Sequence, residues 1–177
     1  MRKQLIMTLV GPDQVGIVQR VSRIVLEHGG NVEDSRMARL GGDFAMIVLA
    51  STSSAQMDEM DCSLQKLNGD GLQVFTRQTD ESGTVSYSGW IPYSVSVTGA
   101  DHEGIVNSVT DLLAEKNINV ELMETDTTAS PMSGTILFSM KAIIVVPPDL
   151  PYNEWYDHLD GIAEDLNLTL DVTLYKG

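Results

Sequence analysis

The chain contains 177 residues, a length that suits one ordinary domain or two small ones. Hydrophobic residues make up 42% and charged residues 20%, so the bulk of the chain is not expected to be disordered. The 25 acidic residues outnumber the 11 Lys and Arg residues and give a net charge of −14, which argues against binding to nucleic acid or to an anionic membrane surface.

The single cysteine and the first residues bear on the compartment in which the protein works. Cys62 has no second cysteine with which to form a disulfide, which favours a reducing compartment. The apolar run near Met1 is short, is interrupted by Thr8 and is followed by Asp13, so no secretory signal is expected. No apolar stretch approaches the ~20 residues of a membrane span. We therefore expect a cytoplasmic protein.

The first half of the chain predicts six elements. Apolar residues alternate from Leu5 to Leu9, which is typical of a strand with one buried face. A helical stripe follows and should end in a left-handed cap at Gly29-Gly30. Two strands should form a hairpin that turns at Gly41-Gly42, before a second helix and a last strand. The expected ranges are about 5–9, 17–25, 31–40, 43–51, 57–67 and 71–78.

The second half repeats the first at a shift of 88 positions (99 − 11). The pattern G-x-D-x-x-G-I-V starts at Gly11 and again at Gly99, and Asn-Val-Glu starts at Asn31 and again at Asn119. Such a match without gaps is hard to obtain by chance. Asn117 takes the place of the glycine cap, and the second hairpin has a longer connection. The expected ranges are about 93–97, 105–113, 118–126, 134–146, 152–162 and 168–175.

Two copies of β-α-β-β-α-β predict an α+β protein of two ferredoxin-like domains, each an antiparallel sheet with its helices on one face. We expect the domains at 1–78 and 90–177, with a Ser-, Thr- and Gly-rich linker at 79–89. Residues 1–88 hold 8 basic and 11 acidic side chains (net −3), whereas residues 89–177 hold 3 and 14 (net −11). Similar cores with different surfaces suggest that the copies no longer do identical work.

The glycine loop between the first strand and first helix is the candidate site. We expect Gly11 to allow a sharp turn and Asp13 to cap the helix. Gly16 should fall in the first helical turn, where glycine costs ~1 kcal/mol relative to alanine and so suggests that another group approaches closely. The second copy carries the same residues at Gly99, Asp101 and Gly104.

The chemistry of this loop suits a small zwitterion such as an amino acid. Free amides at a helix N-terminus favour a carboxylate, and an aspartate could pair with an ammonium group. Asn31 and Asn119 begin the next strand of each copy and offer amides that can donate and accept hydrogen bonds. The alternative is purely structural: the aspartates cap, the glycines allow packing and the asparagines serve the turn.

The repeated motif and the β-α-β-β-α-β order resemble the ACT domain family over nearly the whole chain. The doublet without an enzyme domain resembles the glycine cleavage system transcriptional repressor group, tandem ACT modules that act through protein partners. The resemblance implies ligand binding where two ACT domains pair, between the loop of one and a strand of the other. It assigns ligand-binding roles to Gly11, Asp13, Gln14, Val15, Gly16, Ile17 and Asn31, and to Gly99, Asp101, His102, Glu103, Gly104, Ile105 and Asn119.

The expected function is that of a non-catalytic, homodimeric sensor that binds a small amino acid and signals through a protein partner. The partner could be a transcription regulator of glycine or one-carbon metabolism. No cofactor, metal, catalytic residue, nucleic acid or membrane contact is expected, and Glu103 should make the second site weaker for a carboxylate. A ligand-free dimerisation module remains the alternative. An acylphosphatase-like enzyme is disfavoured because neither glycine loop carries Lys or Arg.

Overall fold

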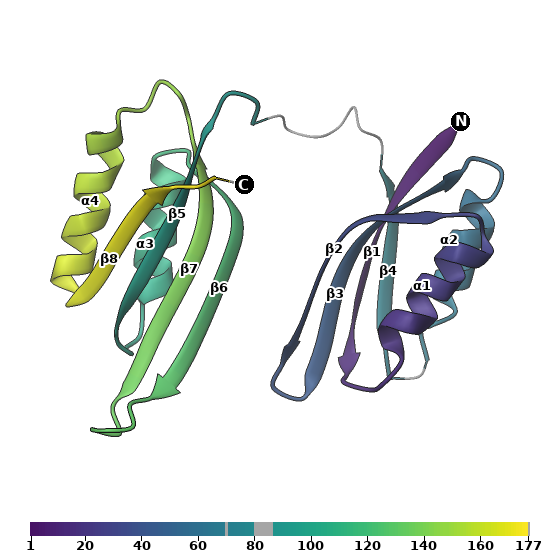
Figure 1. Ribbon diagram of the computed structural model, residues 1–177, viewed down its shortest axis with the longest axis horizontal. Coiled ribbons are helices and arrows are strands. Elements are labelled where there is room, and N and C mark those ends of the chain that lie inside the picture. The colour runs from purple at the N-terminus through teal and green to yellow at the C-terminus, as the bar shows by residue number, and fades with distance from the viewer. Residues whose placement is uncertain (70, 80–86, 177) are drawn as a thin grey trace. The chain divides into compact units, whose positions relative to one another are not determined.

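The computed structural model describes residues 1–69, 71–79 and 87–176 (Figure 1). The chain forms two compact units, Met1–Val85 and Ser86–Gly177. The linker expected at 79–89 falls largely on residues 80–86, which lie outside the described residues. Thr79 itself is the last residue of a strand.

The first unit contains a four-stranded antiparallel sheet in the order β2-β3-β1-β4. Both helices lie on one face of this sheet (Figure 1). The predicted ferredoxin-like order is thereby confirmed for this unit. Its elements are β1 (Arg2–Pro12), α1 (Ile17–Glu27), β2 (Asn31–Leu40), β3 (Asp43–Ser53), α2 (Met57–Gln65) and β4 (Gln73–Thr79).

The second unit repeats this architecture, with the strand order β6-β7-β5-β8. Every pair of neighbouring strands is again antiparallel, as predicted. The longer connection expected in this copy lies between Ala129 and Ile136, at the end of its hairpin. The elements are β5 (Ile91–Ala100), α3 (Ile105–Glu115), β6 (Asn119–Ala129), β7 (Ile136–Val146), α4 (Tyr152–Asp165) and β8 (Leu168–Leu174).

The alternating residues of the central strands build the two cores. Leu5, Met7 and Leu9 of β1 are fully buried and share one hydrophobic cluster with Val21 of α1 and Met60 of α2. Side chains in a strand alternate between its two faces, so the residues between them point away from the helices. The core of the second unit also contains a tryptophan. Trp155, on the inner face of α4, is completely buried, as its sequence spacing predicts.

The first helix of each unit ends where the sequence predicts. Gly29 has φ 62°, and the amide of Gly30 donates to the carbonyl of Val25 at 2.8 Å. In the second unit Asn117 has φ 54°, and the amide of Ile118 donates to Leu113 at 2.8 Å. Both ends therefore use a left-handed residue to satisfy the last carbonyls of the helix.

The starts of these helices differ from the prediction. The N-cap residues are Gly16, with φ 97°, and Gly104, with φ 93°, and neither helix has a capping side chain. The expectation that Asp13 and Asp101 cap the helices was wrong. A Cβ on Gly16 or Gly104 would meet no protein atom within 4 Å, so packing by the protein itself does not require these glycines. It is the positive φ, which side chains disfavour, that calls for glycine here.

The first glycines of the motif are needed for close packing within the sheet and do not form a turn. Gly11 belongs to β1, and a Cβ there would lie 2.6 Å from the carbonyl oxygen of Gly71 and 2.9 Å from the side chain of Leu72. Gly99 is equivalent, since its Cβ would lie 2.6 Å from the side chain of Leu168. The chain that leads into the neighbouring strand passes too close for any side chain.

We predict that Gly11→Ala lowers the free energy of unfolding by about 2 kcal/mol, because the added methyl group must displace backbone. Chemical denaturation followed by circular dichroism measures this change. Gly42→Ala is the matched control, since a Cβ there meets nothing within 4 Å and the residue has no positive φ. The control should stay within roughly 0.5 kcal/mol of the parent protein. Equal effects of the two substitutions would contradict the packing role of Gly11.

Candidate functional site

The loop Asp13–Gly16 leads directly from the central strand β1 into α1. The amide of Asp13 donates to the carbonyl of Gly42 at 3.0 Å, which attaches the loop to the turn between β2 and β3. The helix begins with the bond from the Arg20 amide to the Gly16 carbonyl at 2.9 Å. The amides of residues 17–19 therefore have no acceptor within the helix and carry the positive end of its dipole.

A hollow of about 520 Å³ lies against this helix start. Its volume is in the range of sites that hold small molecules. Val15 is fully exposed beside it, whereas the side chain of Ile17 is 3% exposed and belongs to the core, so residue 17 offers mainly backbone. The lining residues are Asp13, Gln14, Val15, Gly16, Ile17, Val18, Gln19 and Phe44.

Opposite charges meet at this loop. A guanidinium nitrogen of Arg39, from β2, lies 3.8 Å from a carboxylate oxygen of Asp13. Their side chains are 68% and 40% exposed, so the ion pair is weak and each group can exchange its partner. A zwitterion needs one cation and one anion as partners, and this pair provides both beside the free amides of α1.

The loop of the second unit is held differently. The amide of Asp101 donates to the carbonyl of Ile136 at 2.9 Å, as Asp13 does to Gly42. The His102 ring, however, places Nδ1 3.1 Å from the carbonyl of Glu103 and Nε2 3.2 Å from the carbonyl of Leu166. His102 thereby attaches the second loop to the end of α4. The equivalent residue of the first loop, Gln14, lines the hollow instead.

The two asparagines lie far from the loops of their own units. Asn31 pairs with Ser51, which pairs with Gln4 near the start of β1, whereas Gly11 lies at the end of that strand. Seven residues of strand separate Gln4 from Gly11, a distance of about 23 Å. Asn119 is placed in the same way relative to Gly99. Within one unit the structure does not bring the loop and the asparagine into one site.

Asn31 instead belongs to a polar cluster at the opposite end of the first sheet. The hydroxyl of Ser51 donates to the carboxylate of Glu33, and Arg2 donates to that hydroxyl at 2.9 and 3.2 Å. Hydrogen bonds from Ser51 and then Asn31 lower the pKa of the Glu33 carboxyl below its ordinary value. In the second unit Val145 stands where Ser51 stands in the first, so that sheet lacks this hydroxyl.

Three residues near these sites escape sequence reasoning on the motif alone. Phe44 lines the hollow because it pairs with Gly11, and Arg39 pairs with Phe44 across the hairpin. The turn at residues 41–42 predicts the second pairing, but the first depends on β3 lying beside β1. Arg2 reaches Ser51 for the same reason.

Two further properties concern the described residues as a group. Over residues 1–69, 71–79 and 87–176, no three His, Cys, Asp or Glu side chains are placed to hold a metal ion. None of the helices in that part of the chain combines the length and apolar character needed to cross a membrane.

Comparisons with known proteins agree with this doubled fold. Residues 3–71 match the ACT domain family. The chain is 32% identical over 119 residues to the glycine cleavage system transcriptional repressor of Escherichia coli (strain K12), a match that covers 66% of this chain and 60% of that protein. It is also 32% identical over 78 residues to UPF0237 protein MK1213 of Methanopyrus kandleri, covering 42% of this chain and 87% of that protein.

Solved structures extend the likeness to the whole chain. An unknown protein from Galdieria sulphuraria is 35% identical, with a TM-score of 0.87 over 99% of this chain and 100% of that one. A protein provisionally described as a glycine cleavage system transcriptional repressor shares the fold, with a TM-score of 0.71 at 22% identity over 100% of this chain and 99% of that one. The doubled fold and these matches define a chain of two ferredoxin-like units, the first of which matches the ACT domain family over residues 3–71. Over 119 residues the chain resembles the glycine cleavage system transcriptional repressor.

We predict that Ser51→Ala raises the pKa of Glu33 toward its ordinary value of 4.5, because the largest cause of the lowered pKa is the hydrogen bond from Ser51. In the parent protein the stabilisation by ionised Glu33 is present above its ordinary pKa and lost as the pH falls through the lowered one. A titration of the carboxyl carbon by NMR measures the pKa. Ser53→Ala, on the same strand, should not change it, and an unchanged pKa in Ser51→Ala would contradict the assignment.

We predict that His102→Ala loosens the second loop. Backbone amides of residues 102–104 should exchange with solvent about fivefold faster, since one lost hydrogen bond is worth about 1 kcal/mol. Hydrogen exchange followed by mass spectrometry or NMR measures this. Gln14→Ala is the matched control in the first loop and should leave exchange there unchanged. If these amides exchange at the same rate in His102→Ala as in the parent protein, His102 does not hold the second loop.

Proposed function

We propose that this protein is a non-catalytic regulatory module that binds a small amino acid at the first glycine loop. The observation that carries the proposal is the hollow at the start of α1, where free helix amides lie beside the opposed charges of Asp13 and Arg39. A ligand carboxylate would accept hydrogen bonds from the amides of residues 17–19 and pair with Arg39. The ammonium group would pair with Asp13, and a short side chain would pack against Phe44.

A complete site requires a second domain. Asn31 and Asn119 lie at the far ends of their own sheets, so the amide that the family resemblance assigns to the ligand must come from another copy of the fold. We therefore propose that the protein works as a homodimer in which a paired domain supplies this asparagine. Ligand at such an interface favours one pairing over another, and that shift in population is the signal.

The proposed regulatory role rests on the similarity to a transcriptional repressor, of whose length the match covers 60%. We propose that the signal passes to a protein partner, such as a transcription regulator of glycine or one-carbon metabolism. The net charge of −14 disfavours direct contact with nucleic acid or an anionic membrane. A reducing cytoplasm suits the single Cys62, which is exposed.

The two loops should differ in affinity, the first binding more tightly. Glu103 adds a second carboxylate to the second loop, where an arriving ligand carboxylate would be repelled by about 1 kcal/mol in bulk water and by more at a protein surface. His102 already links the second loop to α4 and takes the place of Gln14. The first loop carries neither feature.

We predict measurable binding of at least one common amino acid by isothermal titration calorimetry, with thermal shift used to screen them. Asp13→Asn should weaken that binding roughly tenfold or more, because it removes the charge that pairs with the ammonium. Asp101→Asn is the matched control and should leave the main binding event unchanged. If only Asp101→Asn abolishes binding, the site lies in the second loop. Absence of binding to every amino acid would leave a ligand-free dimerisation module.

A further inference from the structure

The face of the first sheet that points away from the helices is apolar. Residues that pair directly across neighbouring strands have their side chains on the same face, so the strand register shows which residues form each row across this face. One row runs Arg36, Ile47, Thr8, Phe75 from β2 to β4, and Phe75 is 66% exposed. The other residues of this outer face include Ile6, Val10, Asp34, Ala38, Ala45, Leu49, Gln73 and Arg77.

The equivalent face of the second sheet is polar. Because Gly99 corresponds to Gly11, the row equivalent to Arg36–Ile47–Thr8–Phe75 contains, in order, Glu124, Lys141, Ser96 and Asp171. Ile47 is thus matched by a lysine and Phe75 by an aspartate. A charged and hydroxyl-rich row is typical of a sheet face in water. The fold does not require the apolar residues of the first face, and exposed apolar patches of this kind mark interaction sites.

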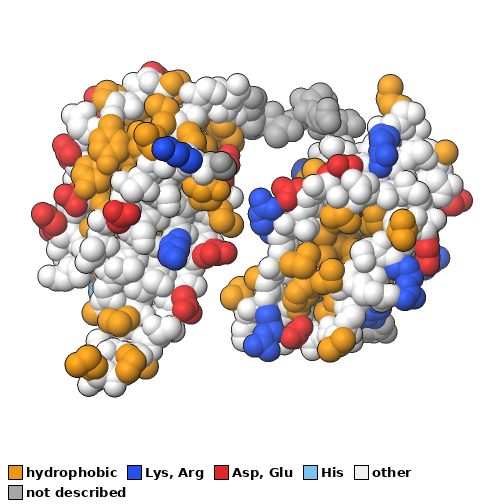
Figure 2. All heavy atoms as spheres, in the orientation of Figure 1, with side chains coloured by type: hydrophobic (Ala, Val, Ile, Leu, Met, Phe, Trp, Pro, Cys, Tyr) orange, Lys and Arg blue, Asp and Glu red, His pale blue; other side chains and the backbone are white. Residues whose placement is uncertain are grey.

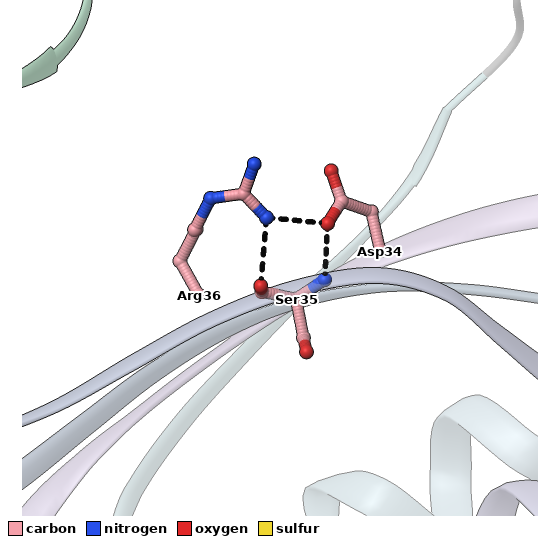
Figure 3. A network of polar contacts seen from close by, with 3 residues as sticks. All are labelled: Asp34, Ser35 and Arg36. Atoms are coloured by element: carbon pink, nitrogen blue, oxygen red, sulfur yellow. Dashed lines mark hydrogen bonds and ion pairs between the residues drawn. The ribbon is translucent and has the colours of Figure 1, made fainter. Parts of the chain in front are cut away.

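Charges lie at the two edges of the first face. Asp34 and Arg36 stand on β2, where the Arg36 guanidinium bonds the Asp34 carboxylate at 2.5 Å and the Ser35 carbonyl at 2.9 Å (Figure 3). Arg77 stands on β4, in the same row as Asp34 at the opposite edge. In the view of Figure 2, hydrophobic side chains gather over the strands of the first unit, with Lys and Arg side chains around them.

We propose that this outer face binds the same face of a second copy of the chain. A two-fold axis parallel to the strands places β2 of one sheet opposite β4 of the other. Asp34 of each copy then faces the edge that carries Arg77 of the other, and Arg36 faces the edge that carries Phe75. The charges are therefore complementary at both edges, and an Arg opposite an aromatic ring adds a cation–π contact.

The distribution of charge favours the same arrangement. Residues 1–88 have a net charge of −3 and residues 89–177 of −11, so pairing through the first unit brings together the nearly neutral parts of two chains. Two sheets packed face to face with nearly aligned strands bury such inner residues between them. Leu49 and Ile47 of one copy would pack over Ile6 and Thr8 of the other. An axis parallel to the strands keeps the Asn31 position level with Gln4 in both copies and away from the loops, so this pairing is additional to the loop–asparagine contact of the proposed function and is independent of amino-acid binding.

Light scattering of the full chain after size exclusion tests the pairing, since one chain has a mass of 19.3 kDa. We expect a dimer for the parent protein and a dissociation constant raised roughly tenfold or more by Phe75→Asp or Ile47→Lys. Both substitutions introduce the residue that the second sheet carries at the same position, so the fold accommodates them. Thr169→Asp, on the exposed outer face of the second sheet, is the control and should leave the dimer intact.

A charge exchange sharpens the test. Asp34→Arg and Arg77→Asp should each weaken the dimer, and the double variant should recover it, which a merely structural role would not produce. A monomeric parent protein would overturn both this inference and the proposed homodimer. A dimer that survives Phe75→Asp and Ile47→Lys, or a double variant without recovery, would overturn the face assigned here and leave the homodimer. Calorimetric titration with amino acids reports separately on the ligand site.

Discussion

The left-handed conformation of one residue at the end of the loop before the first helix determines the geometry of each unit. Gly16 and Gly104, with φ 97° and 93°, let the chain leave β1 or β5 and begin a helix at the next residue. A residue with a Cβ would pay a backbone penalty there, although the space beside it is empty. Because this turn also exposes the first helical amides to the hollow, the fold and the candidate site depend on the same backbone conformation.

The spacing of apolar residues predicted the helices and strands well, because the buried residues of each recur at a regular interval along the sequence. The hairpin at residues 31–40 and 43–51 and the two left-handed helix ends are found where alternation and turn residues place them. The predicted helix starts were wrong because residue type alone favours an aspartate cap, whereas the left-handed Gly16 occupies the N-cap position itself. A cap depends on backbone angles that the sequence pattern does not fix.

The candidate site was predictable only in part, because its residues come from different strands. The motif itself lines the hollow, but Phe44 and Arg39 reach it through pairings that depend on the strand order β2-β3-β1-β4. The same order places Asn31 beside Ser51, about 23 Å from the loop. The repeated motif therefore indicated which residues occupy equivalent positions in the two units, and did not indicate which of them lie together.

The two units have similar cores and different surfaces, and the differences fall at corresponding positions. His102 replaces Gln14 and links the second loop to α4, while Lys141 and Asp171 replace Ile47 and Phe75 on the outer face. Buried positions resist change because each affects packing, whereas exposed ones are free to diverge. The first unit holds both the open hollow and the apolar outer face. Since the hollow lies at the α1 end of the sheet and the outer face lies opposite its helices, one copy of the fold could hold a ligand and a second chain at the same time.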